Sequence, residues 1–359
     1  MKRAVLIMAG GKGERFWPLG RVNLPKQFLR IGGSETLIGS TISRMLDLVD
    51  RENMFIVTGA RYRKEFELHM PDFLAANIIY EPEGRDTLPA VAYASAIIKE
   101  RLGECVIAVL AADHIVGDLS KFHAVMRTAY DQAEHDEHAL ITIGISPVRP
   151  DTNYGYVHVG KAVESSDVKT FSVLAFKEKP DKRTAERFLS VGDYYWNSGM
   201  FVWRTDALFS AIEKNAADIH TERTAVSRAL AAGDAAAAEA AFLRMRKVSV
   251  DFGIMEGAKR VLCVTGSFGW DDVGSFSAYE RIYPRDEKGN TLVGKSVAVN
   301  AANSIVINNS DTLAVIAGVE DIVVVRTEDA LLVCRKGDDA AVKDALKKLR
   351  DASGYERFL

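Results

Sequence analysis

Apolar runs and helix-like segments alternate along the first 145 residues of the chain. The runs at 4–9, 54–59, 77–81, 105–111 and 139–145 are continuously apolar and have the length of buried strands. Segments with helical periodicity lie between them, at 36–49, 61–70, 87–101 and 119–135. Buried strands that alternate with helices usually pair in parallel and are covered on both sides. The pattern therefore predicts an α/β fold with a Rossmann-like, mostly parallel sheet and helices on both faces.

The pattern changes twice further along the chain. Residues 156–159 and 170–178 indicate a hairpin, and the alanine-rich stretch 231–246 predicts a helix. After Pro284, short β-type runs separated by Asn, Gly and Asp continue until a helix signal near 339, which is typical of a sandwich, a barrel or a β-helix. We therefore predict two domains, 1–285 and 286–359.

Composition narrows the class of protein. With 48% hydrophobic and 26% charged residues and a net charge of −3, the chain matches a globular protein and gives no sign of broad nucleic-acid or membrane binding. The three cysteines, Cys105, Cys263 and Cys334, are dispersed and lie in apolar runs, so we expect reduced core residues rather than disulfides or a zinc site. A cytoplasmic protein without a membrane span is the expectation.

The glycine-rich segment after the first predicted strand is the first candidate for chemistry. Gly10, Gly11 and Gly13 allow close backbone approach to a phosphate, but they match neither the Walker A loop nor the dinucleotide fingerprint. Arg15 and Lys26 follow and could neutralise a polyphosphate. An ordinary strand-to-helix turn with two solvated cations remains the alternative.

Carboxylates supply a candidate metal site. Asp113 follows the apolar strand 105–111, where a carboxylate suits Mg²⁺, although a helix cap or turn is equally compatible. One carboxylate of the pair Asp271 and Asp272 could be the second ligand, or the pair could belong to a helix start. His114, a single histidine, is more typical of a hydrogen-bonded structural residue.

Two further segments carry groups that suit a sugar phosphate. Glu178 and Lys179 end a predicted strand, and Asn197 and Ser198 precede another. A carboxylate and an amide can hydrogen-bond sugar hydroxyls, while a lysine can bind a phosphate monoester. Each segment alone is also compatible with a surface turn.

Taken in order, these segments resemble the sugar-1-phosphate nucleotidyltransferases. The shared pattern is A-G-G-x-G-x-R, then P-K, a strand-end Asp, Y-G-Y, E-K-P, W-N-S-G and W-x-D-V-G. A narrower resemblance, to the mannose-1-phosphate guanylyltransferases in that family, rests on FWPLGRVNLPKQF (16–28), EPEGRDTLPA (81–90), WNSGMFVW (196–203) and DFGIMEGAKRV (251–261). It covers nearly the whole chain and implies that the segment after 285 is a short left-handed β-helix.

The resemblance implies a role for each candidate residue. Catalytic roles fall to Arg15, Lys26 and Asp113, and Asp113 and Asp272 would hold Mg²⁺ or, alternatively, Mn²⁺. The implied nucleotide-binding residues are Ala9, Gly10, Gly11, Gly13, Glu81, Arg85, Asp86, Thr87 and Pro89. The implied sugar-phosphate-binding residues are Gly155, Glu178, Lys179, Asn197 and Ser198. Asp86 stands where the family commonly has Asn, so it could contact the base, pair with Arg85 or cap the helix at 87–101.

The implied reaction joins GTP and α-D-mannose 1-phosphate to give GDP-mannose and pyrophosphate. Alternatives are dTTP or UTP with glucose 1-phosphate, GTP with a heptose phosphate, or a non-catalytic regulatory relative. The resemblance also implies a homodimer and no nucleic-acid partner.

Overall fold

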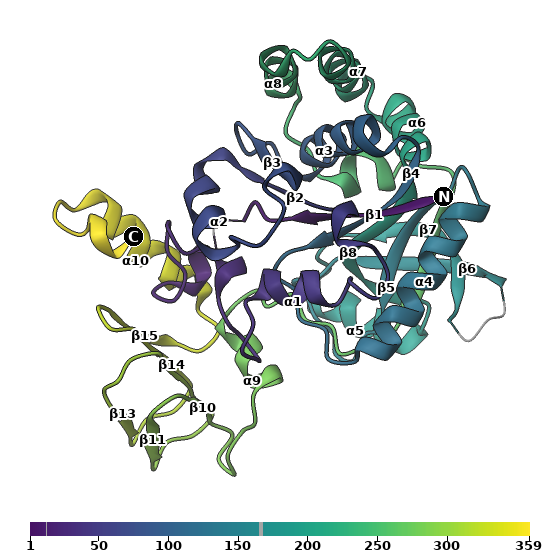
Figure 1. The fold of residues 1–359 in the computed structure, drawn as a ribbon. Helices are drawn as coiled ribbons and strands as arrows, with labels where there is room; N and C mark the ends of the chain where they lie inside the picture. Colours follow the sequence, from purple (N-terminus) through teal and green to yellow (C-terminus); the bar gives the residue numbers. More distant parts are fainter. Residues whose placement is uncertain (12, 165–167) are drawn as a thin grey trace. The chain divides into compact units, whose positions relative to one another are not determined.

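The computed structural model describes residues 1–11, 13–164 and 168–359, and the chain forms two compact units (Figure 1). The first unit comprises residues 1–10, 42–111 and 116–270, and the second comprises 11–41, 112–115 and 271–359. This grouping crosses the boundary that we place between 285 and 286 from the sequence, and that boundary stays a prediction. Within the described part of the chain, no helix is both long and apolar enough to cross a bilayer.

A nine-stranded sheet forms the centre of the first unit. Its strands lie in the order β3-β2-β1-β4-β8-β5-β9-β7-β6. Their bounds are β1 Lys2–Met8, β2 Met54–Gly59, β3 Ile78–Glu81, β4 Cys105–Ala111, β5 Leu140–Ile145, β6 Tyr156–Glu164, β7 Thr170–Lys177, β8 Tyr194–Arg204 and β9 Val261–Gly266. The five strands predicted from apolar runs are confirmed as β1 to β5, and the predicted hairpin is β6–β7.

The pairing of the strands corrects the prediction of a mostly parallel sheet in part. The neighbours β3, β2, β1 and β4 are parallel to one another, and β5 is parallel to β9. However, β8 is antiparallel to β4, β5 and β6, and β7 is antiparallel to β6 and β9. The sheet is therefore mixed, because β7 and the long strand β8 run in the opposite direction to the other strands.

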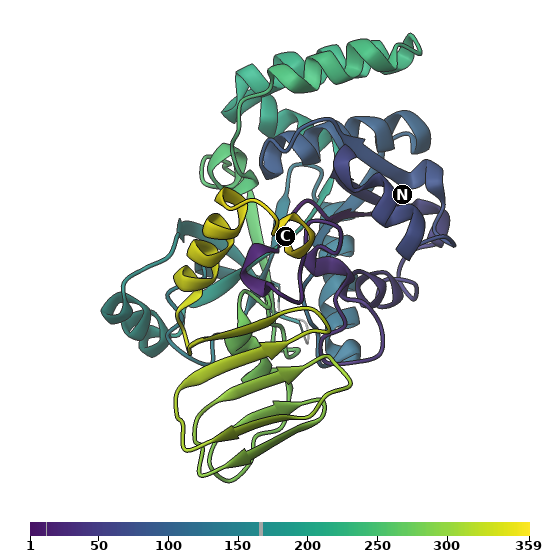
Figure 2. The same cartoon turned by 90° about the vertical axis from the view of Figure 1, so that its left-hand side faces the viewer.

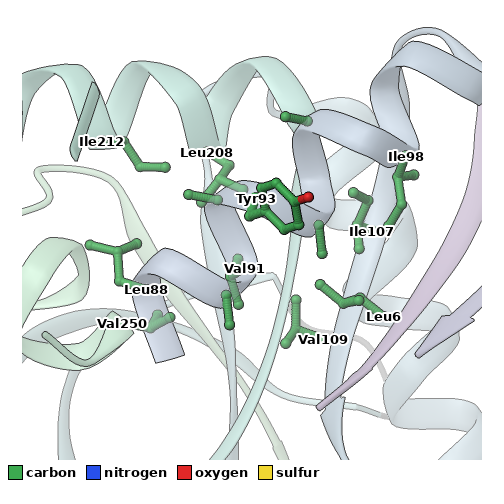
Figure 3. Packing of buried hydrophobic residues seen from close by; sticks show 14 of the residues in the cluster. Leu6, Leu88, Val91, Tyr93, Ile98, Ile107, Val109, Leu208, Ile212 and Val250 are labelled. Atoms are coloured by element: carbon green, nitrogen blue, oxygen red, sulfur yellow. The ribbon is translucent and has the colours of Figure 1, made fainter. Parts of the chain in front are cut away.

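Helices cover both faces of this sheet (Figure 1). The bounds are α2 Arg63–His69, α3 Thr87–Leu102, α4 Leu119–His135, α5 Lys182–Val191, α6 Thr205–Asn215, α7 Ala217–Ala231 and α8 Ala235–Arg244. On one face, Leu6 of β1 and Ile107 and Val109 of β4 pack against α3 and α6 in a hydrophobic core (Figure 3). Helix α4 packs against β4, β5, β8 and β9 through its own buried face. The predicted layered arrangement is thereby confirmed.

Two predicted helices differ from the observed ones. The segment 36–49 is helical only over α1, Leu37–Ser43. The alanine-rich segment 231–246 contains the end of α7 and the start of α8, separated at Gly233, whose φ of 70° is left-handed. Asp234 caps α8 by accepting a hydrogen bond from the amide of Ala237 (2.9 Å). A glycine followed by a capping Asp is thus a helix boundary, despite the surrounding alanines.

A β-helix forms the largest part of the second unit (Figure 2). Its strands are β10 Thr291–Val293, β11 Ser296–Val299, β12 Ile305–Asn308, β13 Ala314–Ala317, β14 Ile322–Arg326 and β15 Leu331–Arg335. Strands β10, β12 and β14 stack in parallel, as do β11 and β13, and β15 covers the edge of β14 in antiparallel fashion. Of the three all-β interpretations, the β-helix is confirmed.

Buried asparagines hold the turns of the β-helix. The amide nitrogen of Asn290 donates to the carbonyl of Ala301 (2.9 Å), and that of Asn308 donates to the carbonyls of Lys295 (2.7 Å) and Thr312 (2.6 Å). Backbone groups that leave the strands at the corners are therefore satisfied by side chains. This explains the Asn-rich spacing seen in the sequence.

The remaining parts of the second unit pack on the β-helix. They include the short turns η1 Glu14–Phe16 and η2 Lys26–Phe28 and the helices α9 Tyr279–Ile282 and α10 Asp339–Asp351. One core joins Phe16 and Trp17 to Ile305 of the β-helix and to Val342 and Leu346 of α10. The N-terminal loop and the C-terminal helix thus share one hydrophobic core.

Candidate active site

Gly13 shapes the turn that carries the predicted phosphate-binding loop. Its φ of 63° is left-handed, and a Cβ there would lie 2.7 Å from Cβ and 2.8 Å from the backbone nitrogen of Lys26. A larger residue would meet both a strained backbone and a backbone contact, so only glycine suits the position. Lys12, within the same loop, lies outside the described residues.

Lys26 lies at the centre of the site. Its side chain is only 9% exposed, and its Nζ donates to Oδ2 of Asp113 (2.7 Å) and to the backbone carbonyl of Asp272 (2.8 Å). Burial acts to raise the pKa of Asp113, but the charges of Lys26 and His114 and the hydrogen bond from Lys26 together hold that pKa below its ordinary value. The structure therefore brings together three predicted residues from distant parts of the chain.

The alternatives left open for Asp271 and Asp272 are distinguished by their contacts. Asp271 is buried, forms a two-pronged ion pair with Arg281 and accepts the amide of Val273 (2.8 Å). Asp272 accepts the amide of Gly274 (3.1 Å) and lines the same cavity as Lys26. Asp271 therefore holds the turn, while Asp272 is the carboxylate available to the cavity.

The cavity has a volume of about 390 Å³, and its lining is mostly charged. It is lined by Gly13, Glu14, Arg15, Phe16, Lys26, Asp113, His114, Asp272, Gly274 and Lys343. Arg15 is exposed and lies 3.4 Å from the carbonyl of Gly274 through Nη1. All three residues predicted to be catalytic and both predicted metal ligands thus line one cavity.

The donor set in this cavity fits a hard divalent cation. Asp113 and Asp272 offer carboxylate oxygens, and the described residues contain no group of three or more His, Cys, Asp or Glu side chains arranged as a metal cage. Mg²⁺ is usually held by one or two carboxylates together with water and substrate phosphates. The residues present are consistent with that arrangement and not with a closed structural metal site.

The C-terminal helix α10 adds residues that the sequence analysis did not select. Lys343 lines the cavity, and Asp339, one turn earlier, interacts with Arg15, Ser275 and Lys343. Burial raises the pKa of Asp339 against the attraction of these groups. The helix is also tied to the loop by Arg350, whose guanidinium lies 2.7 Å from the carboxylate of Glu14. An exposed lysine on an amphipathic helix gives no sequence signal for such a role.

A second group of predicted residues lies in the first unit, around Glu81 at the end of β3. The side chain is 6% exposed, and its Oε2 makes no hydrogen bond to any described residue. A Cβ on Gly10 would lie 3.5 Å from Oε1. Burial raises the pKa of Glu81 to about 7, although Arg61 acts to lower it. A buried carboxylate with one oxygen that no described residue bonds, beside a glycine backbone, can accept hydrogen bonds from a ligand.

The backbone around this carboxylate is held in place by its neighbours. Ala9 donates its amide to the carbonyl of Val57 (2.9 Å) and accepts the hydroxyl of Thr58 (2.9 Å). Gly11 is unobstructed, since a Cβ there would meet nothing within 4 Å. The predicted loop is thus anchored at its start and open where it leaves the strand.

Arg85, Asp86 and Thr87 are joined to one another and to a neighbouring loop. Arg85 donates to the carbonyl of Met245 (2.8 Å), and the hydroxyl of Thr87 accepts the amide of Val250 (2.9 Å). Asp86 has a φ of 69° and accepts the amide of Thr87 (2.7 Å), so it caps α3, and Arg85 pairs with Glu83 (3.0 Å). Pro89 is buried in α3. Of the alternatives for Asp86, capping is what the geometry supports.

The predicted sugar-binding residues meet at one end of β8. A Cβ on Gly155 would lie 2.6 Å from Oε2 of Glu178, and the carbonyl of Gly155 accepts the amide of Asn197 (2.8 Å). The Asn197 side chain donates to Oδ1 of Asp251 (2.7 Å), a residue that we did not select from the sequence. Burial raises the pKa of Asp251, with hydrogen bonding to Asn197 opposing and Glu178 reinforcing the shift. Its signal was the segment DFGIMEGAKRV, already quoted for the resemblance.

Lys179 and Ser198 differ in their surroundings. Lys179 is exposed, has a φ of 42° and pairs with Glu178 at 3.0 Å. Ser198 is buried, and its hydroxyl donates to the carbonyl of Ile143 (2.6 Å) and accepts the amide of Met200 (3.2 Å). The geometry leaves Lys179 accessible to a phosphate and gives Ser198 a role in holding β8 on β5.

A larger cavity of about 480 Å³ lies elsewhere in the first unit, at the starts of β5 and β9. It contains none of the predicted site residues. Ligands of α/β sheets bind at the carboxyl ends of the strands, and this cavity is at the opposite ends. The predicted site residues lie instead in the charged cavity and in the two groups of polar residues described above, each within its own unit.

Comparison with known proteins identifies the family of the chain. Residues 4–289 match the family described as "Nucleotidyl transferase", and residues 294–349 match the "MannoseP isomerase/GMP-like beta-helix domain". A mannose-1-phosphate guanylyltransferase from Klebsiella pneumoniae is 38% identical over 357 residues, covering 98% of this chain and 75% of its own. The alginate biosynthesis protein AlgA of Pseudomonas aeruginosa is 35% identical over 359 residues, covering 97% and 72%.

A solved structure supports both parts of the fold. A protein from Thermus thermophilus, described as a "mannose-1-phosphate geranyltransferase", superimposes with a TM-score of 0.86 and 32% identity, covering 98% of this chain and all of its own. The match spans the α/β part and the β-helix together. The chain therefore belongs to the nucleotidyl transferase family, among the mannose-1-phosphate guanylyltransferases.

Proposed function

We propose that the protein transfers GMP from GTP to α-D-mannose 1-phosphate, giving GDP-mannose and pyrophosphate. The observation that carries the proposal is the contact of Lys26 with Asp113 and with the backbone of Asp272 in a charged cavity beside the Gly13 turn. This combination of a buried ammonium, two carboxylates and a glycine turn suits a polyphosphate with a bound cation. The names of the relatives supply the substrates.

In the proposed reaction, an oxygen of the sugar phosphate attacks the α-phosphorus of GTP. The new bond joins that oxygen to the α-phosphorus, and the bond from the α-phosphorus to the bridging oxygen of the β-phosphate breaks. The bonding electrons leave with pyrophosphate, so atoms and charge balance without a proton transfer. Such transfers depend on positioning and on stabilising charge rather than on covalent chemistry from the protein.

The residues of the charged cavity receive the phosphate roles. Gly11 and Gly13 let the backbone approach the triphosphate, Arg15 binds it, and Lys26 stabilises the charge that develops on the reacting phosphate. Nucleotidyl transferases are typically metal-dependent. We propose that Asp113 and Asp272 hold Mg²⁺, with Mn²⁺ as the alternative, and that the cation neutralises phosphate oxygens when bound.

The guanine is assigned to the residues around Glu81. Guanine presents N1–H and an exocyclic amino group side by side, and a carboxylate can accept both. Glu81 supplies such a carboxylate next to Gly10, with one oxygen that has no partner among the described residues. Arg85, Asp86 and Thr87 keep this edge in place through α3, with Asp86 as the helix cap rather than a base-reading group.

The sugar is assigned to the residues around Asn197. Glu178 and Asn197 provide an acceptor and an amide for mannose hydroxyls beside the exposed backbone of Gly155, and Lys179 binds the phosphate. Asp251 is a positioning residue, because it accepts the Asn197 amide and so fixes which face of that amide points outward.

Three further statements complete the proposal. The division at 285 and 286, the left-handed sense of the β-helix and the homodimer are inferred from the family resemblance alone. The alternatives with another base or sugar keep the same chemistry. A non-catalytic relative is disfavoured, because Arg15, Lys26, Asp113, Lys179 and Asp272 are all present.

A matrix of nucleotides and sugar phosphates tests the function. Pyrophosphate release is measured for GTP, ATP, UTP and dTTP, each with mannose, glucose and heptose 1-phosphates. We expect GTP with mannose 1-phosphate to give the highest kcat/KM. A higher value for UTP or dTTP with glucose 1-phosphate would replace the proposed pair, and no release with any pair would contradict catalysis.

A further inference from the structure

Lys343 of the C-terminal helix lines the cavity that contains Arg15, Lys26, Asp113 and Asp272. It comes from the helix that follows the β-helix, far in sequence from the family's glycine-rich loop. Two buried side chains, Val342 and Leu346, fix the helix in the core that also holds Phe16. The lysine next to Val342 is therefore presented from a rigid element and not from a loose terminus.

Contacts on both sides of Lys343 fix its place next to Arg15. Asp339, one helical turn earlier, is attracted to both Arg15 and Lys343 and accepts a hydrogen bond from Ser275. Further along the same helix, Arg350 pairs with Glu14, the neighbour of Arg15, at 2.7 Å. The helix and the Glu14–Phe16 turn are thus in direct contact, and Arg15 and Lys343 both lie near Asp339.

The other charged side chains of the cavity do not suffice to neutralise a bound nucleoside triphosphate. The ammonium of Lys26 is paired with Asp113, so it brings little net charge of its own. Arg15 is shared with Asp339. A bound nucleoside triphosphate carries about four negative charges, and a divalent cation neutralises only part of them. The β- and γ-phosphates, which leave together, therefore need a further cation in the cavity.

We propose that Lys343 binds the β- and γ-phosphates of the nucleotide and the pyrophosphate that they become. The inference rests on the proposed function for the identity of the nucleotide, and it adds the C-terminal helix to the binding site. Lys343 acts as a point charge that orients the leaving group, next to the planar guanidinium of Arg15. It has no role in reading the base or the sugar.

The test is direct binding, without turnover. Dissociation constants for pyrophosphate, GTP and GMP are measured by calorimetry for the wild type, Lys343→Ala, Lys343→Arg and the control Lys348→Ala. Lys348 is an exposed lysine of the same helix that does not line the cavity. We expect Lys343→Ala to weaken pyrophosphate and GTP about tenfold and to leave GMP within twofold. Lys343→Arg should restore most of the affinity.

Comparing GTP, GMP and pyrophosphate tests this inference independently of the proposed function. GMP lacks the two outer phosphates, so equal weakening of GTP and GMP by Lys343→Ala would overturn the inference. Unchanged pyrophosphate affinity in Lys343→Ala relative to Lys348→Ala would overturn it as well. If another nucleotide than GTP proves to be the substrate, the function fails, yet pyrophosphate still reports on Lys343. Thermal unfolding of each variant shows whether α10 remains folded.

Discussion

Asp271 and Asp272 are neighbours in the chain, yet the first is buried in an ion pair with Arg281 and the second faces the charged cavity. Of these two residues, Asp272 is therefore the one whose carboxylate faces the cavity. Because the two carboxylates differ in position by a single residue, they form a natural pair for testing the metal site.

Replacing each of them by asparagine should have a different effect, on Mg²⁺ dependence for Asp272 and on stability for Asp271. Asp272→Asn removes a charge from the cavity, so we expect the Mg²⁺ concentration for half-maximal activity to rise more than tenfold and kcat/KM to fall about 100-fold. Asp271→Asn should keep the Mg²⁺ dependence and lower the melting temperature, since Arg281 loses its charged partner. Mg²⁺ titrations with thermal unfolding compare the two. A wild-type Mg²⁺ response in Asp272→Asn would remove it from the metal site.

Lys26 should be required both for the stability of the folded protein and for catalysis. In Lys26→Ala the carboxylate of Asp113 loses its partner and stays partly buried, so we expect a loss of about 2 kcal/mol in the free energy of unfolding at neutral pH. We also expect kcat to fall at least 100-fold, because the cation at the reacting phosphate is gone. Lys26→Arg should not rescue activity, since a fork cannot replace a buried point charge. Urea unfolding and steady-state kinetics measure both effects.

The pH dependence of the Lys26 variant provides its own check. In the wild type the pKa of Asp113 is lowered, so the stability from the ion pair is present above the ordinary Asp pKa and is lost as the pH falls through the lowered value. Without Lys26, burial acts unopposed by that charge, and stability should instead fall as the pH rises through the new pKa of Asp113. An unfolding free energy with the wild-type dependence on pH would contradict the pairing.

Glu81 should make the protein less stable as the pH rises. Burial raises its pKa in the folded state from 4.5 to about 7, so the folded protein binds the proton more tightly and its stability declines across that window. The free energy of unfolding of Glu81→Gln should not decline in this way. Relative to the wild type, it should therefore rise by roughly 3 kcal/mol between pH 4.5 and pH 8. Parallel pH curves for the two proteins would show that the carboxyl is not protonated on burial.

The same variant tests recognition of the base. If Glu81 accepts both hydrogens from guanine, the wild type should prefer GTP over inosine triphosphate, which lacks the exocyclic amino group, by about tenfold. Glu81→Gln should bind GTP more weakly and lose most of that preference. Isothermal titration at pH 8, where the carboxyl of Glu81 is ionised, gives all four affinities. A preference retained in the variant would assign base reading to another group.

Replacing Asp251 should weaken binding of the sugar phosphate and leave binding of the nucleotide unchanged. Its carboxylate accepts the Asn197 amide at 2.7 Å, so Asp251→Leu would leave that amide without its partner and allow it to rotate. We expect the KM for mannose 1-phosphate to rise about tenfold while the KM for GTP stays within twofold. Asp251→Asn, which retains an acceptor oxygen, should recover most of the loss. An equal rise in both KM values would indicate general damage to the fold.

Apolar runs predicted β1 to β5 because buried strands need no information beyond local hydrophobicity. The direction of β8 was not predictable in this way, since its place between β4 and β5 depends on pairing with distant strands. Individual motifs identified Lys26 and Asp113 as candidates, but their contact joins residues separated by 87 positions. Lys343 and Asp251 were missed because a lysine on an amphipathic helix and an aspartate at the start of a short helical segment have no distinctive local pattern.

The shared core of Phe16, Val342 and Leu346 has a consequence for how the protein is made. The glycine-rich loop leaves the ribosome well before the helix that packs on it. Contacts of such long sequence separation form late in folding. A nascent chain that already contains Lys26, Asp113 and Asp272 is therefore still unable to complete the charged cavity, whose lining includes Lys343 of α10.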